Sequence, residues 1–179
     1  MLNSRGNGYA GWYLKHTGLR GNALENVVYY DPAPKITPPD DWPLGLLLPQ
    51  IGWVAMRSDW EHDGTVFALK SGRYYPSHQH RDQSTFMINV AGDYLAADPG
   101  YRDQSSRQAW EFTTSTAGHN GILVDGKGQL YGDGSIEGFF TSPPFDYVRA
   151  EAGDVYPELS RATRAVAYVR PDCFVVFDQ

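Results

Sequence analysis

The sequence contains a single cysteine, Cys173, so no disulfide can form within the chain and no cysteine-based zinc cluster can be built. We expect Cys173 to be a small buried apolar residue, because unpaired cysteines most often have that role. Long hydrophobic runs are also missing: the longest, residues 44–48, is far shorter than the roughly 20 residues that a membrane-spanning helix needs. The sequence therefore excludes a disulfide scaffold and predicts no membrane insertion.

Positive charge is scarce. The chain has 15 Lys and Arg residues against 21 Asp and Glu residues, which gives a formal net charge of −6. Nucleic-acid binding depends on clustered basic side chains that neutralise phosphates, and the sequence has no basic block long enough for this. We therefore expect no nucleic-acid partner. The N-terminal residues lack the apolar stretch of a signal peptide, so none is predicted in this chain.

Turn-forming residues are frequent, with 19 glycines and 12 prolines, and long helical patterns are missing. After Gly52, β-prone runs recur at a spacing of roughly 8–12 residues, which is typical of an antiparallel sandwich or barrel. The predicted strands are residues 53–57, 66–70, 85–90, 94–97 and 121–124, with two more, 165–169 and 173–177, around a turn at 170–172. The sequence thus predicts an all-β fold.

One short helix is predicted before the strands. Four residues with ring side chains recur at positions i, i+3, i+4 and i+7, the spacing of one helix face: Tyr9, Trp12, Tyr13 and His16. We expect this face to pack against the core and the helix to end near Gly18. Six of the prolines follow between residues 31 and 49, where they remove backbone donors from helices and sheets, so this stretch is predicted to be a connector.

The residues best suited to chemistry are histidines. His78, His80 and Asp82 alternate along the chain, and alternate residues of an extended segment share one face, with roughly 6–7 Å between successive Cα atoms. That spacing suits metal ligands or an acid–base pair. The alternative is that both histidines simply flank a solvated turn.

Two further residues extend this group. Asp98 follows a predicted strand, and His119 comes just before another one. Zinc accepts three nitrogen or oxygen ligands and keeps a fourth position for water or another group, so two imidazoles and a carboxylate near strand ends form a plausible zinc set. In the alternative interpretation, Asp98 only caps a Pro-Gly turn.

Four motifs occur together in this region: Arg57-Ser58-Asp59-Trp60, His78-Gln79-His80-Arg81-Asp82-Gln83-Ser84-Thr85-Phe86, Asp98-Pro99-Gly100-Tyr101 and Gly118-His119-Asn120. Together they resemble the motifs of the heparinase II/III-like family of polysaccharide lyases. The resemblance covers the region from Gly52 to Asp125 well and extends more loosely to Gln179. In that family, a helical toroid precedes an antiparallel β-sandwich, and the active site lies in the cleft between them.

The resemblance implies a domain organisation. Residues 1–30 would be a remnant of the toroid, residues 31–51 the connector, and residues 52–179 a heparinase II/III-like β-sandwich domain that is truncated at its C-terminus. The chain would then be a fragment of a longer enzyme.

The resemblance also implies site residues. His80, Asp98 and His119 would bind one zinc ion with a mainly structural role, and His78 would be the catalytic residue that reaches into the cleft. Asp82 could accept a hydrogen bond that fixes an imidazole tautomer. The tyrosine and the second histidine or asparagine that the family's toroid contributes have no counterpart in this sequence.

The implied function is cleavage of a uronic-acid polysaccharide, such as a glycosaminoglycan or alginate, by β-elimination. Lys70, Arg73 and Arg81 give the histidine segment a local positive charge that suits an anionic sugar. The family implies a secreted or periplasmic parent protein, and the isolated fragment is expected to be inactive. The oligomeric state is not indicated.

Two alternatives remain open from the residues. A cupin is also a metal-binding sandwich with a His-x-His strand, although it would place a glutamate three or four residues later, where this chain has Gln83 and Ser84. A non-catalytic carbohydrate-binding module would use exposed aromatic side chains to stack on sugars, whereas most aromatic residues simply fill cores.

Overall fold

The structure, a computed structural model, describes residues 8–17, 35–76, 78–101 and 106–179. The chain divides into two compact units, residues 1–42 and residues 43–179. No helix in the described ranges has both the length and the apolar character needed to cross a membrane.

The first unit contains the predicted helix, α1 (Gly8–Thr17). The expectation that its aromatic stripe faces the core is wrong for Tyr13 and His16, which are exposed. Trp12 and His16 lie one helical turn apart and stack on each other, with ring centroids 4.2 Å apart. These rings therefore pack along the helix itself.

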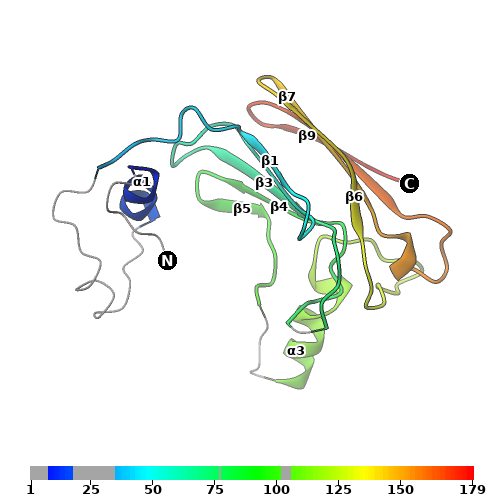
Figure 1. Ribbon diagram of the computed structural model, residues 1–179. Coiled ribbons are helices and arrows are strands. Elements are labelled where there is room, and N and C mark those ends of the chain that lie inside the picture. Colours follow the sequence, from blue (N-terminus) through cyan, green and yellow to red (C-terminus); the bar gives the residue numbers. More distant parts are fainter. Residues whose placement is uncertain (1–7, 18–34, 77, 102–105) are drawn as a thin grey trace. The chain divides into compact units, whose positions relative to one another are not determined.

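The second unit is a sandwich of two antiparallel sheets that face each other (Figure 1). The first sheet contains β1 (Gly45–Leu48), β2 (Trp53–Arg57), β3 (Thr65–Lys70), β4 (Thr85–Val90) and β5 (Asp93–Ala96), in that spatial order. The second contains β6 (Ser135–Ser142), β7 (Phe145–Glu151), β8 (Thr163–Val169) and β9 (Cys173–Asp178). Helix α3 (Arg107–Thr113) and the 3-10 turn η1 (Thr116–Gly118) lie between the sheets in sequence, and η2 (Gly153–Val155) joins β7 to β8. The predicted antiparallel β-sandwich is confirmed.

Alternating burial along the strands produces the core, because successive residues of a strand point to opposite faces of its sheet. Both sheets contribute fully buried residues: Val54, Met56, Phe67, Leu69, Val148, Ala150, Val166 and Tyr168. The Phe67 ring stacks on Phe86, at 5.6 Å between centroids, and on Phe174, at 5.4 Å. Phe174 belongs to the second sheet, so this aromatic stack joins the two layers.

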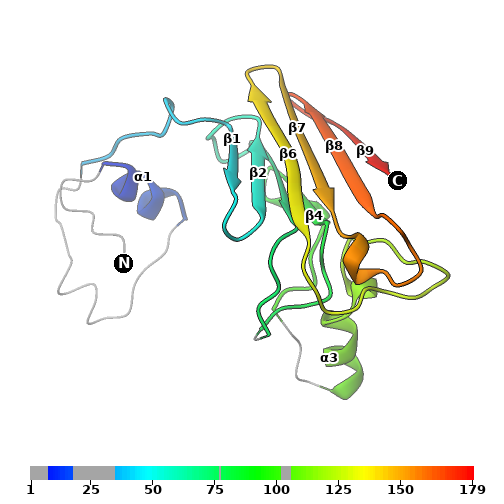
Figure 2. The ribbon, with the colours of Figure 1, turned by 45° about the vertical axis from the view of Figure 1, so that its right-hand side comes forward.

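The two ends of the sandwich differ in the length of their connections (Figures 1 and 2). At one end, which we call the turn end, lie the hairpin connections of residues 58–64, 91–92, 143–144 and 170–172. At the other, which we call the loop end, lie the long connections of residues 71–84, 97–134 and 152–162. Long loops on a rigid scaffold are where binding and catalytic residues concentrate.

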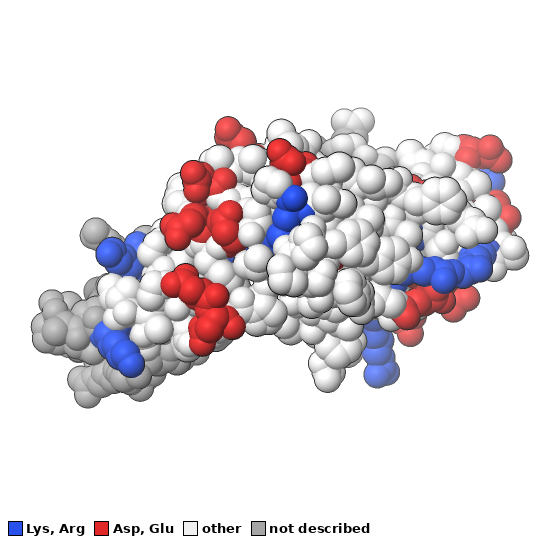
Figure 3. Space-filling view, turned by 90° about the horizontal axis from the view of Figure 1, so that it is seen from above, with Lys and Arg blue, Asp and Glu red and all other residues white. Residues whose placement is uncertain are grey.

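The turn end is rich in acidic side chains. The connection from β2 to β3 alone carries Asp59, Glu61 and Asp63. Figure 3 looks down on this end and shows groups of Asp and Glu side chains among mostly uncharged ones. An anionic ligand would therefore be repelled here, which directs attention to the loop end.

Three predictions about local structure are wrong. Residues 121–124 form only an isolated bridge between Val124 and Lys127, because this segment pairs with itself around a tight turn. Cys173 is exposed, because β9 has a neighbouring strand on one side only among the described residues. Strand β1 lies inside the segment predicted to be a connector, at a point where no proline interrupts the chain.

A buried ion pair closes the turn end. Asp146 of β7 is fully buried and pairs with Arg170, whose side chain is 8% exposed. The Arg170 guanidinium also donates to the backbone carbonyls of Arg57, at 2.8 Å, and Ser142, at 2.5 Å. It thereby connects both sheets at this end.

Replacing one partner of this pair should strongly destabilise the fold. We expect Asp146→Ala to lower the free energy of unfolding by about 3–5 kcal/mol, because the Arg170 charge would stay buried without its counterion. Glu137→Ala, which removes the half-exposed partner of Arg149, should cost less than about 1 kcal/mol. Urea unfolding of the 179-residue chain measures both, and equal losses would contradict this account.

Candidate active site

A hollow of about 450 Å³ opens at the loop end of the sandwich. Side chains from the first sheet and from two long connections line it, among them Trp53, Lys70, His78, His80, Tyr101 and His119. The site residues are contributed by segments that are far apart in the sequence but start or end at neighbouring strands β3, β4 and β5. The sheet thus brings three of the four motifs together at one place.

Asp98, His119 and His80 form a continuous row. His119 Nδ1 lies 2.7 Å from Asp98 Oδ2, and His119 Nε2 lies 3.2 Å from His80 Nδ1. The His119 side chain is 1% exposed. An ionised carboxylate can only accept, so His119 Nδ1–H donates to Asp98, whereas His119 Nε2 faces both the Thr113 carbonyl oxygen, at 3.1 Å, and His80 Nδ1. The three residues predicted to bind zinc therefore lie together.

The donor atoms of this row fit zinc in part. A separation of 3.2 Å between the two ring nitrogens is close to the edge of a tetrahedron with Zn–N bonds of about 2.0–2.1 Å. Asp98, however, contacts the opposite nitrogen of His119, and among the described residues no three His, Cys, Asp or Glu side chains gather their donor atoms around one point. The two imidazoles could hold the ion directly, and Asp98 would join them only after the His119 ring reorients.

His78 lies at the exposed rim of the hollow and contacts a side chain that the sequence analysis did not assign. His78 Nδ1 is hydrogen-bonded to the Tyr101 hydroxyl, and the two ring centroids are 5.6 Å apart. The φ angle of His78 is 61°, in the left-handed region that non-glycine residues seldom adopt. Such backbone strain is common at functional sites. The segment is therefore a bent loop, and the prediction of an extended chain is wrong.

Asp82 is hydrogen-bonded to a lysine rather than to an imidazole. Its carboxylate pairs with the Lys70 ammonium, and both side chains are largely buried. The same loop that carries the histidines thus neutralises one of the three cations predicted to attract an anionic sugar. The expected hydrogen bond from a histidine to Asp82 is replaced by this ion pair because the loop bends at His78.

The matching family model is that of the heparinase II/III-like C-terminal domain, and it covers residues 43–165. The chain belongs to the heparinase II/III-like family. This family assignment excludes the cupin alternative. No match was found among curated proteins.

Solved structures of heparinases share the fold of this heparinase II/III-like chain. The heparan sulfate lyase HepC from Pedobacter heparinus has 20% sequence identity and a TM-score of 0.70, over 99% of this chain and 27% of that one. A heparinase III, the BT4657 gene product, has 17% identity and a TM-score of 0.70, over 93% of this chain and 25% of that one. The chain spans about a quarter of the length of these structures.

Two side chains fix the backbone of the heparinase-like site. The Asn120 amide donates to the carbonyls of Phe86, at 3.0 Å, and Ala97, at 2.8 Å, and so holds His119 next to the segment of Asp98. Asn120 directly follows His119 in the Gly118-His119-Asn120 motif, and this adjacency is the signal in the sequence for its supporting role.

Arg164 of β8 is the second of these side chains. Its Nη1 donates to the carbonyls of Ser84, at 2.7 Å, and Asn120, at 2.5 Å. Its Nε and Nη2 donate to Asp178 at 2.7 and 2.9 Å. The second sheet therefore holds the two loops that carry His80 and His119. Nothing in the sequence around Arg164 indicates this long-range contact.

The row of site residues shifts two pKa values. Burial, followed by the neighbouring His119 ring, lowers the pKa of His80, although Asp82, Asp98 and the Tyr101 carbonyl oppose this shift. Burial alone would raise the pKa of Asp98, but the hydrogen bonds from His119 and from the Gly100 backbone N–H outweigh it, and the pKa is lowered. At neutral pH, His80 is therefore neutral and Asp98 ionised, the states that metal binding requires.

Replacing Arg164 by lysine should loosen the site without removing the charge. We expect Arg164→Lys to lower the free energy of unfolding by about 1–3 kcal/mol, because a single ammonium cannot bridge Asp178 and two carbonyls that stay buried. The control is Arg161→Lys three residues earlier, where the side chain is 48% exposed. Urea unfolding should leave this control unchanged, and a matching loss there would refute the role of Arg164.

Proposed function

We propose that this chain forms the sandwich wall of the active-site cleft of a polysaccharide lyase that acts on uronic-acid polysaccharides by β-elimination. Membership of the heparinase II/III-like family supports the reaction class. The observation that carries the proposal is the hollow at the loop end, where His78 and Tyr101 contact each other above the His80–His119 pair. These are side chains that can move a proton close to neutral pH once their surroundings adjust their pKa values.

The reaction breaks a C–O bond without water. A base takes the proton from C5 of the uronic acid, the electron pair of that C–H bond becomes the C4–C5 double bond, and the C4–O bond breaks. The leaving oxygen then takes a proton from an acid. The C5 proton is only weakly acidic while the adjacent carboxylate is ionised, so the site must also neutralise that carboxylate.

His78 is suited either to bind the substrate carboxylate or to accept the C5 proton. Its Nδ1 contacts the Tyr101 hydroxyl, and its Nε2 has no hydrogen-bond partner among the described residues. When the tyrosine donates to Nδ1, the Nε2–H can donate to the substrate carboxylate. When Nδ1–H donates to the tyrosine oxygen, Nε2 can accept a proton instead. The contact with Tyr101 thus sets which task His78 performs.

A zinc ion on His80 and His119, with Asp98 as ligand or as the support of His119, would fix the loop that carries His78. Bound zinc would supply mainly a structural cross-link between two loops. His80 and His119 would keep the backbone next to His78 rigid, which matters because catalysis depends on accurate positioning.

The proposed reaction needs a second wall. The chain spans about a quarter of the similar heparinase structures, and a complete parent protein would supply the remaining groups. One wall of a cleft leaves most of a ligand solvated, so the isolated chain should bind oligosaccharides only at about millimolar concentrations. Secretion or periplasmic export of the parent stays a prediction.

Metal content tests the zinc part of the proposal. The purified chain should contain about one zinc ion per molecule, and His80→Ala should lose it with a fall in melting temperature. His62→Ala, which changes an exposed histidine in the β2–β3 connection at the turn end, is the matched control and should keep the ion. A well-folded chain without metal, after expression and purification with zinc present, would count against this site.

Turnover by the complete parent tests the roles of His78 and Tyr101. His78→Ala should lower the rate of uronate polysaccharide cleavage by roughly 10²-fold or more, the usual effect of losing an acid or base, while zinc is retained. Tyr101→Phe should also slow the reaction, whereas Tyr94→Phe, at an exposed position on β5, should not. The ultraviolet absorbance of the new C4–C5 double bond reports the rate. Unchanged rates for both site variants would remove these residues from the mechanism.

A further inference from the structure

Most cations of the sandwich unit are already paired. The described part of residues 43–179 contains ten Lys and Arg side chains, and seven of them form ion pairs with carboxylates. The remaining three are Arg57, Arg73 and Arg81. Arg57 lies at the turn end, where its guanidinium stacks on the Trp60 ring at 3.8 Å. The other two belong to the loop that carries His78 and His80.

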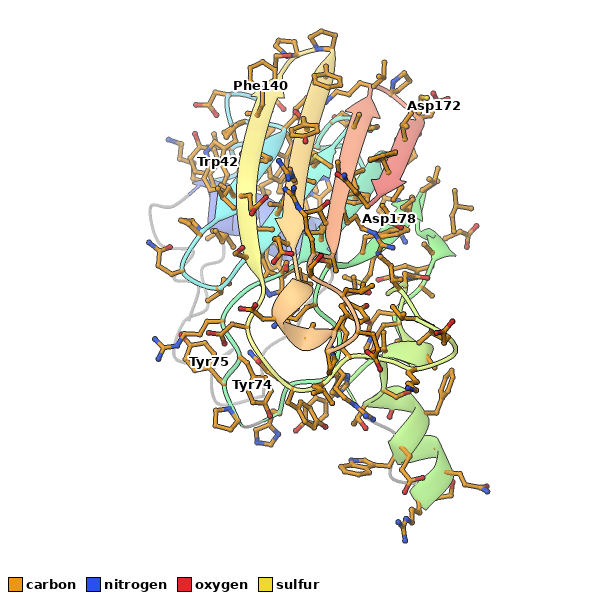
Figure 4. The ribbon with its side chains drawn as sticks, turned by 90° about the vertical axis from the view of Figure 1, so that its right-hand side faces the viewer. Trp42, Tyr74, Tyr75, Phe140, Asp172 and Asp178 are labelled. Carbon is orange, nitrogen blue, oxygen red and sulfur yellow. The ribbon has the colours of Figure 1, made fainter. Side chains whose placement is uncertain are left out.

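Both arginines of this loop lie over tyrosine rings. The guanidinium carbon of Arg73 is 5.6 Å from the ring centre of Tyr75, and that of Arg81 is 5.6 Å from the ring centre of Tyr131. Tyr131 packs on Tyr74 at 5.3 Å between centroids. We call these five residues the arginine–tyrosine patch. Figure 4 shows Tyr74 and Tyr75 at the loop end, away from Phe140 and Asp172 at the turn end.

The backbone beneath the patch is held by hydrogen bonds. The Tyr74 N–H donates to the Asp133 carboxylate at 2.7 Å, and the Gly134 N–H donates to the Gly72 carbonyl at 2.9 Å. The Arg81 N–H donates to the Thr114 carbonyl at 3.1 Å. Asp133, which accepts the hydrogen bond from the Tyr74 N–H, forms no ion pair with either arginine. The backbone that carries the two cations is therefore held in place, and neither cation is neutralised by an ion pair, which lowers the entropic cost of binding an anion.

Arg81 has an unused donor. Its Nε is buried and has no hydrogen-bond partner among the described residues. Buried donors are almost always satisfied, so such an atom needs an acceptor from outside the described residues. A guanidinium presents its N–H groups as a planar fork that matches the oxygen atoms of sulfate or carboxylate groups.

We propose that the arginine–tyrosine patch is a subsite for an anionic substituent, sulfate or carboxylate, of a sugar chain whose next unit occupies the hollow. This inference rests on the proposed function. Neither arginine lines the hollow, but Arg81 lies between His80 and Asp82, which do, so the patch and the hollow share one loop. Exposed faces of Tyr75 and Tyr131 would stack on the sugar rings, as aromatic side chains of mixed polarity do.

Nuclear magnetic resonance of the 179-residue chain tests the patch directly. A heparan sulfate hexasaccharide and its fully desulfated form are titrated separately while the arginine Nε–Hε signals are followed. The Arg81 signal should shift on binding, and the double variant Arg73→Ala/Arg81→Ala should bind at least about tenfold more weakly, the usual effect of losing two charge-assisted contacts. A stronger response to the sulfated form identifies sulfate as the ligand group, and an equal response identifies the carboxylate.

Two control variants separate recognition from bulk charge. Arg107→Ala removes an arginine that is 89% exposed on α3 and should leave the affinity unchanged. Arg73→Lys/Arg81→Lys keeps the charge but loses the fork, and should restore the affinity only in part. Unchanged binding by the alanine double variant, or an equal loss with Arg107→Ala, would overturn the subsite.

The complete parent distinguishes the subsite from the proposed lyase. There the alanine double variant should raise KM with little change in kcat, because the patch binds the ground state and the transition state alike. If the parent produces no unsaturated sugar but the double variant still weakens binding, the lyase proposal fails and the subsite stands. If elimination occurs and KM does not respond, the subsite fails and the lyase proposal stands.

Discussion

A buried guanidinium group, that of Arg164, connects the second sheet with both loops that carry the site histidines. It donates to the carbonyls of Ser84 and Asn120 and is held in turn by Asp178. Buried backbone carbonyls in loops have no strand partner and need another hydrogen-bond donor. One side chain from the opposite sheet satisfies two of them. The distance between the loops of His80 and His119 therefore depends on how the two sheets pack, and so on the apolar core that sets their separation.

Ion pairs at the loop end distinguish an inner group of paired side chains from an outer group of unpaired cations. Asp98 supports His119, and Asp82 neutralises Lys70, so the inner side chains form a satisfied network that can keep its geometry away from water. The unpaired cations lie further out, on the arginine–tyrosine patch. An overall charge of −6 would suggest repulsion of an anionic polymer, but the acidic β2–β3 connection lies at the opposite end of the sandwich from this patch (Figures 1 and 2).

The sequence predicted the scaffold better than the site geometry. Alternating apolar residues placed the strands at residues 53–57 and 85–90 correctly, because burial on one face determines a strand locally. The residues of the predicted zinc set do lie together. The contacts between them were not predictable, since the loop bends at His78 and sends Asp82 to Lys70. Strands β6 and β7 and helix α3 were missed, although the two strands form a hairpin around residues 143–144 and Ser106 caps the helix. The strand pattern of β6 is interrupted by a register shift between Ile136 and Gly138.

In the proposed reaction, the site removes a proton and breaks a C–O bond without water. Digestion of a uronate polysaccharide by the complete parent in ¹⁸O-labelled water, followed by mass spectrometry of the oligosaccharides, distinguishes this reaction from hydrolysis. β-Elimination predicts fragments whose new non-reducing end is lighter by one water molecule than that of the corresponding hydrolysis product. These fragments incorporate no label at the cleaved bond. One ¹⁸O atom at each cleavage point would show that the reaction is hydrolysis and would contradict the account.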